Sequence, residues 1–263
     1  MSSVISLFGM QIDAIDMPAA VQRIVAWCRE PRGSQCRYVV TPNVDHAVMF
    51  QTNVALRESY ASASMVLADG APVVLASRLL RKSLPERVAG SDLVPALFDH
   101  VSAERLSCAT NAESRPLTVF LLGAGPGVAD RAAKVIHDRW PGVEVLGTMS
   151  PPMGFESDEA ENALILQAVA KCRPDVVLIG LGAPKQELWI SRHADRIDAK
   201  AALCIGATID FLAGEKSRAP RLLQTLGLEW VHRMATEPSR LVRRYARDAW
   251  VFPRLVWREW RSQ

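Results

Sequence analysis

Cysteine is scarce in this sequence, and the few cysteines form no motif. The five of them lie far apart, and none is spaced as C-x-x-C. An odd, scattered set argues against a disulfide framework and against a zinc site, and is usual in a reducing compartment. No apolar run reaches the roughly 18 to 20 residues that cross a membrane. The first 16 residues carry acids but no Lys or Arg, unlike a secretory signal. We therefore expect a cytoplasmic protein.

Several motifs of common enzyme classes are also absent. The chain has no G-x-x-x-x-G-K-[ST], no G-x-S-x-G and no H-E-x-x-H, which argues against the commonest nucleotide hydrolases, esterases and zinc proteases. It has no D-x-D either, the pattern that would place a metal on a nucleotide diphosphate. The charge of any diphosphate must then be met by Arg, Lys and backbone N–H groups. We expect no metal and no cofactor.

Lysine is missing from the C-terminal segment, residues 218–263. That segment has ten arginines against four acids, a formal charge of +6, whereas the whole chain carries +3. It also holds four of the seven tryptophans. Arg together with Trp favours contact with phosphates and with a membrane interface. A helix pair with solvated arginines and core-packed tryptophans explains the same composition equally well.

What the chain does have is a repeated order of buried strand, polar turn and amphipathic helix. We expect such strands near residues 38–40, 65–68, 117–122, 143–146, 176–180 and 201–205. The pattern predicts an α/β fold, with mostly parallel sheets flanked by helices in two Rossmann-like halves and an all-helical C-terminal appendage. We place the catalytic domain at 1–217, its halves at about 1–106 and 117–217, and the Arg/Trp-rich appendage at 218–263.

The clearest strand is Val176 to Gly180, which is apolar on both alternating faces and so reads as a central strand covered by helices. A glycine turn then leads into a helix that begins at Lys185. We predict that this turn forms one wall of a ligand site. In that arrangement Gln186 faces the ligand, while Lys185 and Glu187 face solvent.

Polar residues follow the buried strands at the places where a ligand would bind. They are Thr41, Asn43, Asp69, the glycine loop 123–127, Gln186 and Asp210. The carboxyl ends of parallel strands converge on one crevice, although turns and helix caps favour the same residue types. Gly70 follows Asp69 and lets a ligand approach closely. A partly desolvated carboxylate there has a raised pKa and suits proton transfer from a sugar hydroxyl.

The loop GAGPG, residues 123–127, follows a strand and precedes a helix, as a dinucleotide loop does. It departs from G-x-G-x-x-G because Val128 stands where the third glycine belongs, and no acid ends the next strand. A nicotinamide site is weakly supported. A phosphate or nucleotide cradle that uses Gly123, Gly125 and the helix N-terminus stays open.

An ordered set of segments resembles the WecG/TagA/CpsF family of bacterial glycosyltransferases, glycosyltransferase family 26. The segments are TPNVDHA (41–47), LADGAPVV (67–74), ERVAGSDL (86–93), FLLGAGPG (120–127), DVVLIGLGAPKQE (175–187), CIGATIDFLAGEKSRAP (204–220) and GLEWVHRMATEPSRLVRRY (227–245). One departure is the stretch 207–209, where a more glycine-rich or aromatic sequence is expected. The resemblance covers nearly the whole chain.

The resemblance implies an inverting, metal-independent transferase. It would move a sugar from a UDP-sugar, of the N-acetylmannosamine type or glucose, onto a polyprenyl-diphosphate-linked sugar in cell-surface polysaccharide or exopolysaccharide synthesis. Motif by motif, it implies Asp69 as base with Thr41 beside it. It places Asn43, Arg87, Gln186 and Asp210 at the donor, together with the glycine loop.

The resemblance also assigns the C-terminal appendage to the acceptor diphosphate and the membrane, through Arg233, Arg240, Arg243 and Arg244. The spacing of these arginines predicts a basic helix face, and Pro253 is expected to break or kink the helix. We expect a peripheral protein on the inner face of the cell membrane, with no nucleic-acid partner. A homo-oligomer is an open alternative.

Two other functions stay open on the residues alone. A nicotinamide-dependent oxidoreductase would use the GAGPG loop, and a non-enzymatic module for anionic surfaces would use only the Arg/Trp segment. Stabilisation by NAD(H) rather than UDP would favour the first. Steep salt dependence with no role for Asp69 would favour the second.

Overall fold

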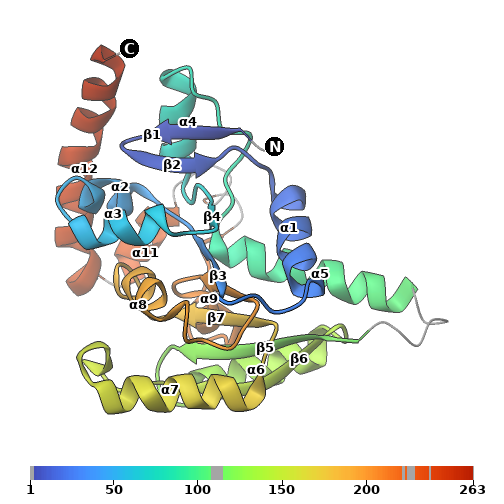
Figure 1. The fold of residues 1–263 in the computed structure, drawn as a ribbon. Helices are drawn as coiled ribbons and strands as arrows, with labels where there is room; N and C mark the ends of the chain where they lie inside the picture. The colour runs from blue at the N-terminus through green and yellow to red at the C-terminus, as the bar shows by residue number, and fades with distance from the viewer. Residues whose placement is uncertain (1–2, 108–114, 221–222, 224–228, 237, 263) are drawn as a thin grey trace. The chain divides into compact units, whose positions relative to one another are not determined.

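The computed structural model describes residues 3–107, 115–220, 223, 229–236 and 238–262 (Figure 1). The chain forms two compact units. Unit 1 comprises Met1–Asp16, Thr41–Ala89 and Ser217–Gln263, and unit 2 comprises Met17–Val40 and Gly90–Lys216. Unit 1 is therefore assembled from three separate stretches of sequence.

Unit 2 is built on parallel strands. In spatial order they are β3 (Arg37–Val40), β8 (Ala201–Cys204), β7 (Val176–Gly180), β5 (Leu117–Gly123) and β6 (Val143–Met149). Strand β7 lies between β8 and β5, as predicted for a central strand. Its residues 176–179 are buried, because neighbouring strands and helices cover them on all sides.

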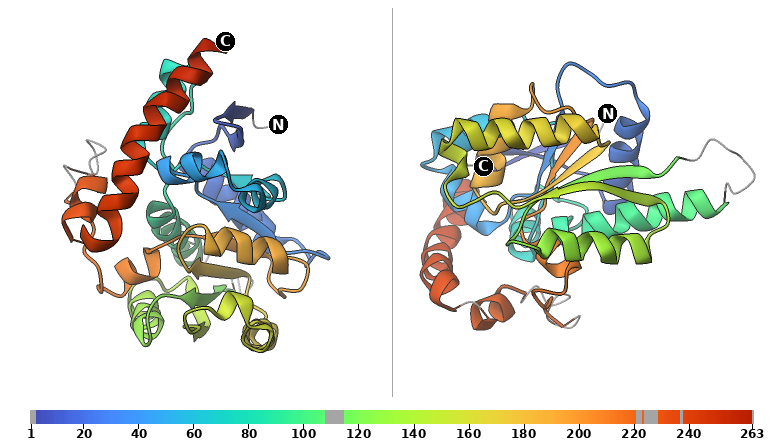
Figure 2. Two further views of the ribbon diagram at one scale, coloured as in Figure 1. Left: turned by 90° about the vertical axis from the view of Figure 1, so that its left-hand side faces the viewer. Right: turned by 90° about the horizontal axis from the view of Figure 1, so that it is seen from below.

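Helices cover both faces of this sheet. They are α1 (Met17–Arg29), α5 (Gly90–Ser107), α6 (Val128–Arg139), α7 (Glu159–Cys172), α8 (Lys185–His193) and the shorter α9 (Thr208–Leu212), with a 3-10 turn η1 (Phe155–Ser157) before α7. Helices α5 and α6 lie on one face, and α7 and α8 on the other (Figure 2). Asp158 caps α7, since its carboxylate accepts hydrogen bonds from the backbone N–H groups of Ala160 and Glu161.

Unit 1 is a smaller assembly of helices around a hairpin. Strands β1 (Val4–Leu7) and β2 (Met10–Asp13) pair antiparallel, and β4 (Met65–Val66) follows later in the chain. The helices are α2 (Val44–Phe50), α3 (Val54–Ala61), α4 (Ala71–Leu79), α11 (Glu229–Thr236) and α12 (Pro238–Arg261). The Asp13 carboxylate accepts a 2.9 Å hydrogen bond from the Val66 backbone N–H, which ties the hairpin to β4.

The C-terminal helix α12 is an integral part of unit 1 and packs beside α2 (Figure 1). Leu241, Phe252 and Leu255 are buried along its inner side, and the Phe252 ring meets Phe8 edge to face at 5.2 Å. We expected Pro253 to break or kink the helix, but α12 continues past it to Arg261. The buried residues on either side of Pro253 hold the helix in place and offset its one missing backbone hydrogen bond.

The predicted fold class is confirmed as an α/β fold with a parallel sheet flanked by helices and a long C-terminal helix. Strands β3 to β8 fall close to the predicted ranges, and the helix predicted to begin at Lys185 does begin there. None of the described helices is both long enough and apolar enough to span a lipid bilayer.

Candidate active site

The segment that links β3 to α2 carries the first two candidates, Thr41 and Asn43. Thr41 is buried. Asn43 caps α2, because its Oδ1 accepts hydrogen bonds from the backbone N–H groups of Asp45 (3.1 Å) and His46 (3.4 Å). His46 Nδ1 accepts a 3.3 Å bond from the Asn43 backbone N–H and completes a capping box. The buried His46 therefore has a structural task at the helix start.

Asp69, the candidate base, lies against this segment. Its backbone N–H donates a 2.8 Å hydrogen bond to the Pro42 carbonyl. Gly70, which follows it, has φ of +120°, and a Cβ added there would lie 3.7 Å from the Cβ of Asn43. A positive φ of this kind favours glycine, so Gly70 is required by the backbone conformation that brings this segment beside Asn43. Unit 1 thus brings Thr41, Asn43 and Asp69 together.

A backbone hydrogen bond places the chain at Arg87 beside the Asp69 segment. The N–H of the next residue, Val88, donates a 2.8 Å bond to the carbonyl of Ala68, which precedes Asp69. The Arg87 guanidinium forms a 3.1 Å ion pair with Glu229 at the start of α11. Arg87 therefore connects the Asp69 segment to the C-terminal helices.

The candidate arginines of the C-terminal segment differ in their environments. Arg243 is exposed on α12. Arg244 is ion-paired with the carboxylate of Asp45, which is 4% exposed, and Arg247 donates a 2.5 Å hydrogen bond to the other oxygen of the same carboxylate. The side chains of Arg233 and Arg240, which lie on α11 and α12, fall outside the described residues.

A second carboxylate, Asp248, is buried beside this pair. Arg247 donates bonds of 3.0 and 3.2 Å to its Oδ1, while its Oδ2 has no partner within the described part of the chain. Burial, and then the nearby negative charge of Asp45, raise the pKa of Asp248 above its ordinary value. Two carboxylates and two guanidinium groups thus form one cluster between α2 and α12, which we name the Asp45 cluster.

In unit 2 the carboxyl ends of three strands meet through glycines. A Cβ on Gly123 would lie 2.5 Å from the carbonyl oxygen of Gly180, and a Cβ on Gly180 would lie 2.9 Å from the carbonyl oxygen of Gly206. No side chain fits at such distances, so the ends of β5 and β7 and the turn after β8 are in direct backbone contact. This is the edge at which parallel sheets bind ligands.

Gln186 and Glu187 are buried together behind that edge. Gln186 Oε1 accepts a 3.1 Å bond from the Gly206 N–H, and its Nε2 donates a 2.8 Å bond to Glu187. The expectation that Glu187 faces solvent is wrong, since its side chain is fully buried. Lys185 is part-exposed and pairs with Glu156 at 2.6 Å. The amide of Gln186 therefore links the start of α8 to the turn at Gly206.

The glycine loop and Asp210 complete the candidates of unit 2. Gly127 precedes α6 with φ of +72°, and no side chain caps the first turn of that helix. Ser150 Oγ donates 3.2 Å bonds to the carbonyls of Gly123 and Gly125. These bonds fix the loop that runs into the helix N-terminus. Asp210 lies in α9, just after the Gly206 turn, and is part-exposed.

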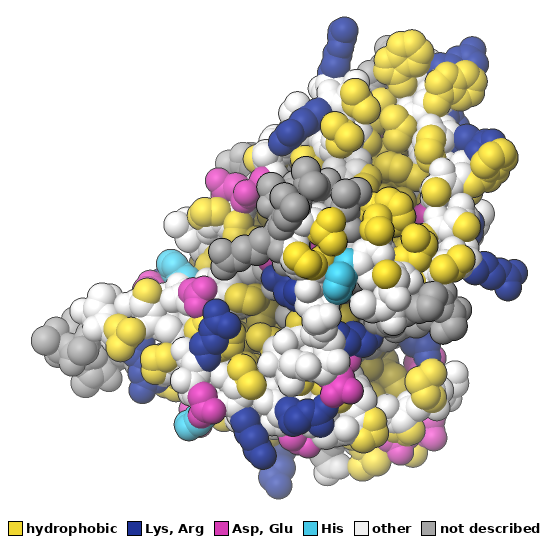
Figure 3. All heavy atoms as spheres, turned by 180° about the vertical axis from the view of Figure 1, so that it is seen from behind, with side chains coloured by type: hydrophobic (Ala, Val, Ile, Leu, Met, Phe, Trp, Pro, Cys, Tyr) yellow, Lys and Arg dark blue, Asp and Glu magenta, His cyan; other side chains and the backbone are white. Residues whose placement is uncertain are grey.

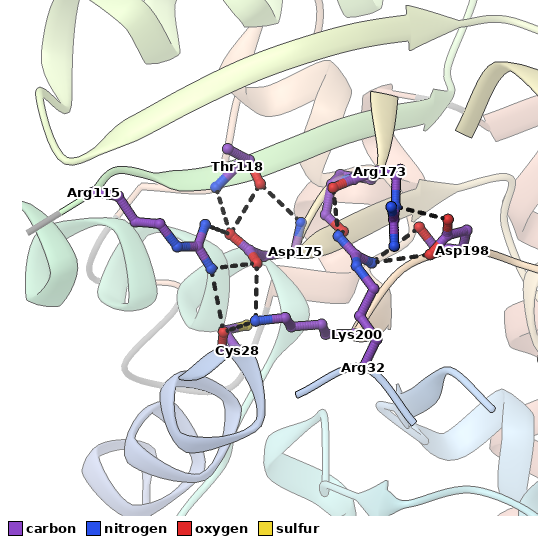
Figure 4. A network of polar contacts seen from close by, with 9 residues as sticks. Cys28, Arg32, Arg115, Thr118, Arg173, Asp175, Asp198 and Lys200 are labelled. Carbon is purple, nitrogen blue, oxygen red and sulfur yellow. Dashed lines mark hydrogen bonds and ion pairs between the residues drawn. The ribbon is translucent and has the colours of Figure 1, made fainter. Parts of the chain in front are cut away.

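At the opposite, amino end of the sheet lies a polar network that the sequence did not reveal (Figure 4). Asp175 is 2% exposed and accepts hydrogen bonds from Arg115 at 2.7 and 2.8 Å and from Thr118 Oγ1 at 2.9 Å, with Lys200 at 3.5 Å. Burial acts to raise the pKa of Asp175, but the bonds from Arg115 and Thr118 outweigh it and hold the pKa below its ordinary value. This network joins the starts of β5, β7 and β8.

The candidates that the sequence missed share one cause. Asp45 and Glu229 pair with arginines from distant segments, and Glu187 accepts a hydrogen bond from the adjacent Gln186. A buried acid at a helix start resembles an ordinary first-turn acid in sequence, so no local signal reveals it. Among the described residues, no three His, Cys, Asp or Glu side chains are grouped as metal ligands.

Comparison with known proteins identifies the family. The model of the glycosyl transferase WecG/TagA/CpsF family matches residues 5–263. One relative is the N-acetylglucosaminyldiphosphoundecaprenol N-acetyl-beta-D-mannosaminyltransferase of Staphylococcus aureus strain MRSA252, 27% identical over 239 residues, which are 91% of this chain and 87% of the relative. The enzyme of the same name from strain NCTC 8325 / PS 47 is 26% identical over the same coverage. Because the family match spans nearly all of the sequence, this chain belongs to the WecG/TagA/CpsF family and is a glycosyltransferase.

Proposed function

We propose that this enzyme transfers a sugar from a UDP-sugar onto a polyprenyl-diphosphate-linked sugar, with inversion and without a metal. The observation that carries the proposal is the 2.8 Å backbone bond from Asp69 to Pro42, which holds the candidate base beside Thr41 and Asn43. Asp69 accepts the proton of the acceptor hydroxyl while the oxygen of that hydroxyl bonds to the anomeric carbon of the donor sugar. The bond from that carbon to the UDP oxygen breaks at the same time.

Unit 2 carries the glycine loop, Gln186 and Asp210, which we propose as donor-binding residues, and we propose the same role for Arg87, a residue of unit 1. The uncapped first turn of α6 offers backbone N–H groups and a favourable helix dipole to a diphosphate. A Cβ on Gly123 would meet the Gly180 carbonyl, so this glycine sets the path of the loop, while Gly125 leaves room for the diphosphate. Asp210 and Gln186 stand at the same strand edge. Since Gln186 already bonds Gly206 and Glu187, its part is to shape the donor wall.

The relatives narrow the expected sugars. Their name describes transfer of an N-acetyl-β-D-mannosaminyl group to N-acetylglucosaminyldiphosphoundecaprenol. A β linkage is the product expected when an α-linked nucleotide sugar reacts with inversion. We propose N-acetylmannosamine as the first donor to test and glucose as the second, for a cell-surface polysaccharide or exopolysaccharide.

We also propose that the enzyme acts at the inner face of the cell membrane, with Arg233, Arg240 and the exposed Arg243 at the acceptor diphosphate. Arg244 contributes indirectly, because Asp45 holds it. The two Rossmann-like halves, the domain limits at 217 and 218 and an oligomeric state remain proposals of the same kind.

The test combines a UDP-sugar panel with a polyprenyl-diphosphate-N-acetylglucosamine acceptor, read by mass spectrometry. Asp69→Asn should lower turnover by about 10² to 10⁴ while UDP still raises the melting temperature. Asp138→Asn, an exposed carboxylate on α6, serves as the matched control and should keep full activity. Full activity of Asp69→Asn would exclude it as base, and stabilisation by NAD(H) alone would favour an oxidoreductase.

A further inference from the structure

Large hydrophobic side chains are exposed mainly in unit 1. Within the described residues of this unit, the most exposed on helices α4 and α12 are Leu75, Leu79, Trp250, Trp257 and Trp260, each more than half exposed. We name these five residues the apolar face. So many large apolar side chains on one surface of a protein mark a site of interaction.

Helix α4 is apolar on its outer side as well as on its inner side. Its inner side buries Val73, Val74 and Ala76, as a core-facing helix does. Its outer side then carries Leu75 and Leu79, which are 58% and 63% exposed. The two leucines are spaced i, i+4 and so form one continuous apolar ridge on the helix.

The end of α4 is fixed beside the last turns of α12. Lys82, three residues after α4, pairs with Glu259 of α12 at 2.7 Å and bonds the Ser6 carbonyl at 3.0 Å. Glu259 also accepts a 2.6 Å bond from the backbone N–H of Phe8. Figures 1 and 2 show α4 next to the C-terminal end of α12, and Figure 3 shows hydrophobic side chains gathered over this region with cations around them.

The chemistry around the apolar face fits an anionic bilayer surface. The Arg254 guanidinium lies 3.6 Å from the Trp250 ring centroid, and that of Arg261 lies 4.8 Å from Trp257. Arg78 and Arg81 are exposed at the α4 side. Tryptophan and arginine together occupy the headgroup zone, where the ring is half buried and the cation meets lipid phosphate. Leucines at the same level enter the acyl boundary.

We propose that α4 is a second lipid-contacting element, in which Leu75 and Leu79 enter an anionic bilayer beside the tryptophans of α12. The role of this surface in catalysis rests on the proposed function. Helix α4 begins directly after Asp69-Gly70 and has nine residues. At 1.5 Å per residue the candidate base lies within about 15 Å of Leu79 along the helix axis. Membrane contact through α4 thus holds Asp69 at the depth where a lipid-linked diphosphate sugar stands.

The first experiment is flotation of the purified full chain with phosphatidylcholine vesicles that contain phosphatidylglycerol. The paired substitution Leu75→Ser and Leu79→Ser should lower the partition coefficient by about tenfold or more, because two leucines no longer leave water. The matched control, Leu106→Ser with Leu164→Ser, alters two exposed leucines of unit 2 and should bind as the unaltered chain does. Equal binding by both pairs would overturn the proposal.

A second measurement reports the depth of α4 directly. Leu79→Cys, in a chain with Cys108→Ser and Cys172→Ser, carries a nitrobenzoxadiazole label. We expect a blue shift with anionic vesicles and quenching by lipids spin-labelled near the headgroup. A label that stays in water while the protein binds would exclude α4 from the contact. If the serine pair instead changes the sedimenting mass and leaves vesicle binding unaltered, the apolar face joins two copies of the chain and the proposal fails.

Vesicle binding needs no donor or acceptor, so its outcome is independent of the sugar assay. A chain that binds vesicles through α4 but transfers no sugar would refute the proposed reaction and leave the lipid contact standing. If the serine pair lowers vesicle binding but leaves transfer to a short-chain, water-soluble acceptor unchanged, the lipid contact and the proposed reaction are both supported, and α4 acts in lipid contact alone.

Discussion

Each unit buries one aspartate against two cations, but the cations have different origins. In unit 2, Asp175 is held by Arg115 and Lys200, which stand just before β5 and β8 of its own sheet. In unit 1, Asp45 is held by Arg244 and Arg247, about two hundred residues later on α12. The first arrangement joins strand starts within a scaffold. The second fastens the C-terminal helix to the helix that follows Thr41 and Asn43.

The two networks therefore have different tasks: the Asp175 network stabilises the sheet, and the Asp45 cluster attaches α12 to α2. The Asp175 network lies at the amino ends of the strands, away from the edge where parallel sheets bind ligands, and therefore serves stability. Asp45 lies two residues from Asn43, so a change in α12 reaches a candidate donor-binding residue through two hydrogen bonds. We expect the first to affect folding and the second to affect the placement of α12.

The largest effect should come from Asp175→Asn. Removing one partner of a buried charge pair typically costs about 3 to 5 kcal/mol, and Lys200 would be left with a buried, weakly paired ammonium group. Urea unfolding followed by circular dichroism should show a loss of about 3 kcal/mol. The control is Asp198→Asn, whose carboxylate pairs with Arg32 and Arg173 in the same region but is 35% exposed. It should cost less than about 1 kcal/mol, and equal losses would contradict the distinction.

Asp45→Asn should have a smaller and more local effect. The carboxylate is buried, but its two arginines are 29% and 48% exposed, so water replaces part of the lost interaction and we expect about 2 kcal/mol. Amide hydrogen exchange should quicken in α12 and in α2 and stay unchanged in β5 and β7.

Arg258→Gln is the comparison for that variant, since Arg258 donates a 2.5 Å hydrogen bond to Gln51, the residue that follows α2. It should leave exchange in α12 within about 0.5 kcal/mol of the original. If exchange quickens in both units of the Asp45→Asn chain, the Asp45 cluster supports the whole fold and is no local attachment.

The smallest effect is one of pH, and its sign should differ between the units. The pKa of Asp175 is lowered by folding, so its contribution is complete above the unfolded value of 3.8 and is lost as pH falls through the folded pKa. The pKa of Asp248 is raised by folding, so the folded state binds its proton first and that site gains stability as pH falls toward 3.8. As the pH is lowered from 7 to 3, amide hydrogen exchange should show protection falling in β7 and rising in α12. The Asp248→Asn substitution should remove the rise in α12.

Much of the fold followed from local pattern. The apolar run Val176 to Gly180 identified the central strand, and the alternation of strands and helices identified the α/β class. The strand-end rule also found Thr41, Asn43 and Asp69, which the structure places side by side. These inferences succeeded because periodicity and the direction of parallel strands are local properties.

The errors arose where a distant segment decides the environment. Glu187 reads as a solvent-facing helix residue, yet its side chain is fully buried and accepts a hydrogen bond from the Gln186 amide, which in turn bonds the Gly206 turn. Pro253 reads as a helix breaker, yet Phe252 and Leu255 anchor the helix on both sides. The sequence also held no sign that Arg244 pairs with Asp45, a residue 199 positions away, and its proposed role at the acceptor diphosphate stays a prediction. Residue type alone does not reveal such partners.

The division of unit 1 into three stretches of chain sets an order on its synthesis. All of unit 2 lies before Ser217, so its sheet is able to close while the ribosome still holds the last segment. Unit 1 has to wait, because its buried carboxylates Asp45 and Asp248 meet their arginines only once α12 has emerged. The surface that carries Leu79 and Trp257 is complete only after α12 has been made. The sheet of unit 2 is thus able to form before the surface that we propose as lipid-contacting.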